Sequence, residues 1–117
     1  MATITFVIST PPYVNGTTNE AHDLIMASTA YGHDANVIFK GEGVLQLLKN
    51  QDPMNNQKHA GKRISGFTFF DIEPLYVCQN SLNSHKIEQD DLISGLSYIS
   101  DQDATQAIEK SDFIIKL

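Results

Sequence analysis

The sequence has few of the residues that form disulfides, metal clusters or nucleic-acid surfaces. Its 117 residues include one cysteine and no tryptophan, and 8 Lys and Arg stand against 14 Asp and Glu, for a formal net charge of −6. A single cysteine excludes an internal disulfide and a multi-cysteine metal cluster. Direct binding of nucleic acid needs a basic stripe, and the sequence has no run of cations beyond Lys62-Arg63.

Targeting and metal-binding patterns are also missing. The first residues lack the basic region of a secretory signal, and no apolar run is long enough to span a membrane, so we expect a cytoplasmic protein. None of the four histidines pairs with another at the helical spacing i,i+3 or i,i+4, so we expect no zinc site. No cofactor motif is complete, and we expect no cofactor. We expect each histidine to lie at the surface; they are His22, His33, His59 and His85.

The remaining residues fit one globular domain over residues 1–117. Hydrophobic residues make up 41% of the chain and aromatic residues 9%, which is ordinary for a folded domain of this size. Short apolar runs alternate with helical spacing, which predicts an α/β fold: a three-layer sandwich with a mainly parallel five-stranded sheet. The predicted strands are residues 4–8, 35–39, 75–78, 96–99 and 113–117. The predicted helices are residues 17–31, 44–48 and 59–70, with a last one from Asp103.

The only cysteine, Cys78, is the last apolar residue of the third predicted strand. Reactive groups gather beyond the carboxyl ends of the strands in such sheets, because loops and helix N-termini converge there. A buried cysteine is also a common packing residue, so both interpretations stay open. A reactive thiol must ionise, which requires a cation or a helix N-terminus beside it. The nearest cations in sequence are His85 and Lys86, and Asn80 or Ser81 is a candidate cap for a following turn.

Two glycine-containing connections are weaker candidates for an anion site. Residues 9–16 join a predicted strand to a predicted helix start, and Gly41-Glu42-Gly43 follows the second strand. Neither has the glycine spacing of a phosphate-binding loop, and plain connections are commoner. The acidic pairs Asp90-Asp91 and Asp101/Asp103 lie in polar stretches, and no G-x-S-x-G hydrolase motif occurs. No complete catalytic constellation is visible.

Several stretches together resemble one known family. They are F-V-I-S-T-P-P-Y at residues 6–13, G-V-L-Q-L-L at 43–48, D-I-E at 71–73 with Y-V-C at 76–78, and D-F-I-I at 112–115. These stretches look like the TusC/DsrF-like subunits of the DsrE/DsrF/DsrH sulfur-relay family, and the resemblance spans nearly the whole chain. It implies a DsrEFH or flavodoxin-like fold.

The resemblance also implies a function. Such a subunit joins TusB-like and TusD-like subunits in a heterohexamer that exchanges persulfide sulfur with TusA-like and TusE-like carriers. The relay ends in 2-thiolation of the wobble uridine of transfer RNA. In the family the essential persulfide cysteine belongs to the TusD or DsrE subunit, so the resemblance implies a supporting role for Cys78. The chain would then be an accessory subunit whose main task is assembly, with no direct contact to nucleic acid or membrane.

Two other functions remain open on the sequence. One is a small-ligand or anion-binding module that uses residues 9–16 and the Gly41 turn. The other is an independent thiol enzyme that uses Cys78. If the chain is a subunit, some apolar residues must form an interface. The candidates are Tyr13, Val14, Leu45, Phe69, Phe70 and Tyr76.

Overall fold

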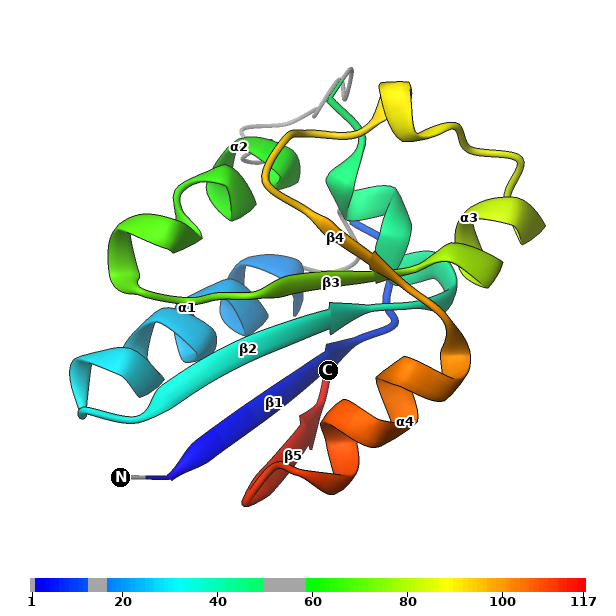
Figure 1. The fold of residues 1–117 in the computed structure, drawn as a ribbon. Helices are drawn as coiled ribbons and strands as arrows, with labels where there is room; N and C mark the ends of the chain where they lie inside the picture. Colours follow the sequence, from blue (N-terminus) through cyan, green and yellow to red (C-terminus); the bar gives the residue numbers. More distant parts are fainter. Residues whose placement is uncertain (1, 13–16, 50–58) are drawn as a thin grey trace.

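Five parallel strands form a single sheet in the order β4-β3-β2-β1-β5 (Figure 1). The computed structural model describes residues 2–12, 17–49 and 59–117. The strands are β1 (Thr3–Ile8), β2 (Asp34–Phe39), β3 (Leu75–Cys78), β4 (Ser97–Ile99) and β5 (Phe113–Lys116). The predicted α/β class and parallel five-stranded sheet are confirmed.

Helices cover the two faces of the sheet unequally. The α-helices are α1 (Thr17–Ala30), α2 (Ala60–Ser65), α3 (Gln79–Ser84) and α4 (Asp101–Glu109), and the 3-10 helices are η1 (Gly41–Leu47), η2 (Phe67–Phe70) and η3 (Gln89–Asp91). The larger core lies on one face, where β1, β2 and β3 pack against α1, η1, α2 and η2. The opposite face packs against α4, with Ile38, Cys78 and Ala104 in a small second cluster. Three layers result, as predicted.

Alternating side chains of the strands supply these two cores. Leu75 and Val77 of β3 point into the larger core, whereas Cys78 points into the smaller one. This follows from the two-residue period of a strand. The last three residues of β1 and of β2 are buried, which explains why these parts, F-V-I and V-I-F, are continuously apolar.

Three predicted elements differ in detail. The helix predicted over 59–70 divides at Gly66 into α2 and η2, and its residues Ala60, Ile64 and Phe67 are all buried. Residues 44–48 were expected to form part of an α-helix, but 44–47 are 3-10 and Leu48 bridges to Leu92.

The last helix starts two residues earlier than expected, because Ser100 accepts a hydrogen bond from the Asp103 N–H at 3.1 Å. No helix was predicted directly after Cys78, so α3 was missed. Leu82 is the only buried residue of α3, so no helical period marks it in the sequence. Within the described ranges, no helix is both long and apolar enough to cross a bilayer.

Candidate functional site

Cys78 ends β3 and immediately precedes α3, at the carboxyl edge of the sheet. Its neighbour across the sheet is Ile99 of β4. The residue is 1% exposed and packs with Ile38 and Ala104 beneath α4. The strand position predicted from the sequence is therefore confirmed, and the thiol is also a packing group.

A hollow of about 350 Å³ lies beside Cys78, between the ends of β2 and β3 and helix α4. Its polar lining comes from three different segments, through Lys40, Ser81, Asp101 and Thr105. The apolar side is formed by α4 through Ala104 and Ile108. The sulfur therefore lies next to a space that opens at the sheet edge, although little of the residue reaches solvent.

Two hydrogen bonds hold the walls of this hollow together. The Gly41 N–H donates to the Ser81 hydroxyl at 2.8 Å, which ties the end of β2 to α3. The Asn80 amide donates to the Asp101 carboxylate at 2.9 Å, which ties α3 to the start of α4. Asn80 and Ser81 therefore join neighbouring segments at the edge that carries Cys78.

The surroundings of Cys78 keep its thiol protonated. Burial raises the pKa of Cys78, the nearby Asp101 carboxylate raises it further, and the Lys40 ammonium opposes them with a smaller effect. A thiol with a raised pKa holds little thiolate at neutral pH, and the thiolate is the nucleophile in sulfur exchange. In this structure Cys78 is therefore a protonated and weakly nucleophilic thiol.

The charged neighbours of Cys78 differ from those nearest in sequence. His85 caps the far end of α3, and Lys86 lines a separate hollow. Lys40 and Asp101 were missed, although the sheet register contains the signal. Phe39 pairs with Val77 and Cys78 with Ile99, so the residues just after β2 and β4 meet at the same edge as Cys78. Lys40 and Asp101 are therefore predictable from their positions just after strands that neighbour β3 in a parallel sheet.

The candidate anion site is partly outside the described residues, since residues 13–16 are not among them. In the described part, the Ser9 N–H donates to the Leu117 carbonyl at 3.1 Å. The Gly41 N–H is bonded to Ser81, and the Gly43 N–H donates to the Lys40 carbonyl at 3.0 Å. These amides already serve internal hydrogen bonds, so they do not converge on a common ligand.

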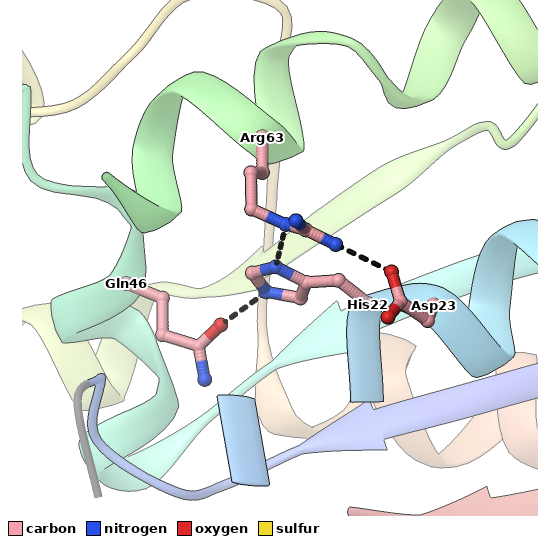
Figure 2. A network of polar contacts seen from close by, with 4 residues as sticks. All are labelled: His22, Asp23, Gln46 and Arg63. Atoms are coloured by element: carbon pink, nitrogen blue, oxygen red, sulfur yellow. Dashed lines mark hydrogen bonds and ion pairs between the residues drawn. The ribbon is translucent and has the colours of Figure 1, made fainter. Parts of the chain in front are cut away.

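A buried polar network forms a second notable cluster (Figure 2), and it centres on His22 of α1. His22 Nε2 lies 2.8 Å from Gln46 Oε1, and Arg63 Nε donates to His22 Nδ1 at 3.3 Å. Because arginine only donates, Nδ1 accepts, and Nε2 carries the proton that goes to Gln46. The Gln46 amide in turn donates to the Thr10 carbonyl at 2.9 Å. Every polar atom of the imidazole therefore has a partner.

The prediction that His22 lies at the surface is wrong, because the residue is fully buried. It lies three residues before buried Ile25, on the core face of α1, and its ring meets Phe67 edge-on at 5.5 Å. Burial has the largest effect on the pKa of His22 and lowers it, and the Arg63 guanidinium lowers it as well. The hydrogen bond to Gln46 and the Asp23 carboxylate raise the pKa, each by less than burial lowers it. Arg63 also pairs with Asp23 at 2.6 Å. The network joins α1, η1 and α2 as a neutral structural cluster.

Of the histidines and acidic pairs singled out in the sequence, Asp101 alone lines the hollow beside Cys78. His59 caps α2 by accepting from the Lys62 N–H at 3.1 Å, His85 is exposed as expected, and His33 is half-buried. Asp91 accepts from the Glu88 N–H in the turn at η3. These residues have local structural roles or face solvent.

The sequence matches the model of a protein family described as the DsrE/DsrF-like family, over residues 2–117. A protein of Aliivibrio fischeri named Protein TusC homolog is 34% identical over 113 residues, which are 94% of each chain. A protein of Vibrio parahaemolyticus with the same name is 30% identical over 112 residues, or 95% of each chain. The crystal structure of the YchN protein of E. coli superposes with a TM-score of 0.86 over the full length of both chains, at 18% identity. That structural likeness concerns the fold alone.

Proposed function

The chain belongs to the DsrE/DsrF-like family, and on this premise we propose that it is a TusC-type subunit of a sulfur-relay complex. In this proposal the complex passes persulfide sulfur toward 2-thiolation of the transfer RNA wobble uridine. The partners are TusB-like and TusD-like subunits in a heterohexamer, with TusA-like and TusE-like proteins as sulfur carriers. The task of this chain is mainly assembly.

One observation supports this proposal above the others: the similarity to proteins named TusC homologs extends along 94% or more of the chain. The family model spans residues 2–117 and therefore includes the first strand, β1, and the last strand, β5. It includes the G-V-L-Q-L-L stretch, in which Gly43 contacts the end of β1 and Gln46 holds His22 and Thr10. Through these contacts the stretch packs η1 against β1 and α1.

The chemistry around Cys78 favours assembly over sulfur transfer. Transfer requires a thiolate to attack the outer sulfur of a donor persulfide, so that a new S–S bond forms and the donor leaves as a thiolate. Cys78 has a raised pKa and is 1% exposed. Both features oppose such an attack in the isolated chain. We therefore assign the relay cysteine to a partner subunit and a supporting role to Cys78.

The decisive variant is Cys78→Ser. We expect it to leave the complex intact and to lower transfer RNA thiolation only slightly, because serine fills nearly the same volume at a packing position. Thiolation is measured by mass spectrometry of the wobble nucleoside in cells that carry only the variant, and assembly by native mass spectrometry. The matched control is the equivalent substitution of the TusD-like cysteine, which should abolish thiolation. Complete loss of thiolation by Cys78→Ser in an intact complex would assign the relay step to Cys78.

Native mass measurement of the chain with its partners tests the proposal as a whole. Co-expression with the TusB-like and TusD-like proteins should yield one complex that contains all three chains. A chain that stays separate from both partners under these conditions is not a subunit of such a complex.

The reactivity of Cys78 separates this proposal from an independent thiol enzyme. We expect alkylation of Cys78 by iodoacetamide at pH 7 to be slower than alkylation of a free cysteine peptide, because burial and Asp101 both disfavour the thiolate. The rate is measured by intact mass over time. Alkylation faster than that of the peptide would favour the enzyme.

A further inference from the structure

The turn between α2 and β3 presents two aromatic side chains to solvent. Phe69 is 87% exposed and Phe70 is 49% exposed, both in η2. Single exposed apolar residues are common on protein surfaces, but adjacent large aromatic ones are typical of contact sites. We call Phe69, Phe70, Asp71 and Glu73 the aromatic turn.

The aromatic turn is fixed by buried residues on either side of it. Phe67 before it and Ile72 after it are fully buried in the larger core. The Asp71 N–H donates to the Thr68 carbonyl at 3.1 Å, and the Ile72 N–H donates to the Phe67 carbonyl at 3.2 Å. Phe69 is therefore held outward on a turn that is already ordered. A rigid anchor loses little conformational entropy when it binds a partner.

An acidic hollow adjoins the aromatic turn. It measures about 460 Å³ and is lined by Thr68, Glu73, Pro74, Leu75, Gly95 and Ser97. Glu73 is its one charged lining residue. Asp71 is exposed nearby in the chain, and Arg63 on the preceding helix is already paired with Asp23. The surface thus combines an apolar projection with negative charge.

We propose that the aromatic turn and its hollow form the docking surface for a partner subunit with a basic, partly apolar contact face. This inference rests on the proposed function, which supplies the partner. Charge selects the occupant: two copies of this chain meeting at the same surface would bring Asp71 and Glu73 against their own equivalents. A lysine or arginine of a different subunit, placed in the hollow, would meet Glu73 instead.

The location of the surface suits a relay subunit. The aromatic turn precedes β3 and lies at the amino end of that strand, whereas Cys78 lies at its carboxyl end (Figure 1). A subunit docked on the turn would contact the edge of the sheet opposite the hollow beside Cys78. Assembly and any contact with a sulfur carrier therefore use opposite edges of the sheet.

Two variants test the docking surface in the full complex. The chain is co-expressed with tagged TusB-like and TusD-like subunits of the same organism, and the amount recovered with them is measured. We expect Phe69→Ser and Glu73→Lys each to reduce recovery by about tenfold or more, as loss of an interface anchor does. The control is Phe113→Ser, which removes a phenylalanine that is 59% exposed on edge strand β5. It should leave recovery unchanged.

The outcomes are distinguishable. Equal urea midpoints for wild type and Phe69→Ser are expected from its exposure, and they exclude misfolding as the cause of lost recovery. If the wild-type chain assembles and both variants assemble equally well, the docking surface is wrong while the proposed function stands. If the wild-type chain recovers with neither partner, the proposed function fails and the docking proposal fails with it. Self-association of the isolated chain that Phe69→Ser removes would make a second copy the occupant and overturn the choice of a basic partner.

Discussion

At the scale of single residues, Gly43 shows how closely η1 lies against the end of β1. A Cβ atom built on Gly43 would lie 2.1 Å from the Ile8 carbonyl oxygen and 2.7 Å from the Ile8 carbonyl carbon. Both atoms belong to the backbone of a buried strand, so they cannot rotate aside. We expect Gly43→Ala to lower the free energy of unfolding by about 3 kcal/mol, in the upper range for overpacking a core. Urea denaturation measures this loss.

Gly41, two residues earlier, provides the matched control. A Cβ there meets nothing within 4 Å, but the backbone has φ of +56°. Gly41→Ala therefore carries only the cost of a left-handed conformation, about 1 kcal/mol. Equal losses for the two variants would show that the contact with Ile8 relaxes easily.

At the scale of elements, the His22 network links stability to pH. His22 is buried as the neutral imidazole, and burial lowers its folded-state pKa below the ordinary histidine value of about 6.5. As pH falls below about 6.5, the unfolded chain binds a proton that the folded chain does not, so stability falls. The loss continues until pH reaches the lower folded-state pKa. We expect a slope that approaches about 1.4 kcal/mol per pH unit within this window.

Substitution identifies the residue behind that slope. His22→Gln should flatten the dependence of unfolding free energy on pH below 6.5, whatever it does to stability at pH 8. His85→Gln removes an exposed histidine and should keep the slope. Urea denaturation at several pH values measures both. A slope unchanged in His22→Gln would mean that other groups, such as the carboxylates, produce it.

Elements with repeated apolar residues were predictable from the sequence, and those fixed by a single contact were not. The strands appear as apolar runs, and α1 and α4 as periodic faces. The α3 helix has one buried side chain, Leu82, and the split of residues 59–70 depends on Gly66, whose N–H bonds to Arg63. His22 was predicted at the surface because histidines are more often exposed than buried. Its burial depends on hydrogen bonds with Gln46 and Arg63, which lie in other elements.

At the scale of the whole molecule, the position of the candidate site could be predicted from the sequence, but the residues that surround Cys78 could not. The strand pattern located Cys78 at the carboxyl edge, and the sheet confirms this. Its neighbours Lys40 and Asp101 depend on the strand order β4-β3-β2, which the sequence does not state. The pKa of Cys78 depends on those neighbours and on burial. The sequence alone therefore could not show that this pKa is raised.

The unequal cover of the two faces predicts how the molecule opens. The α1 helix packs against the larger core, whereas α4 closes the smaller one over Cys78. Helices with less buried apolar contact detach at lower free energy. We expect native-state hydrogen exchange, measured by mass spectrometry, to be faster for amides of α4 than for amides 25–29 of α1. Exchange should be slowest in β2, because it is the central strand of the sheet. Detachment of α4 would expose Cys78 without unfolding the larger core, so the rate of thiol labelling should follow the population of the state in which α4 is detached. Exchange of α1 and α4 at equal rates would instead mean that the two layers open together and that the thiol is reached only by global unfolding.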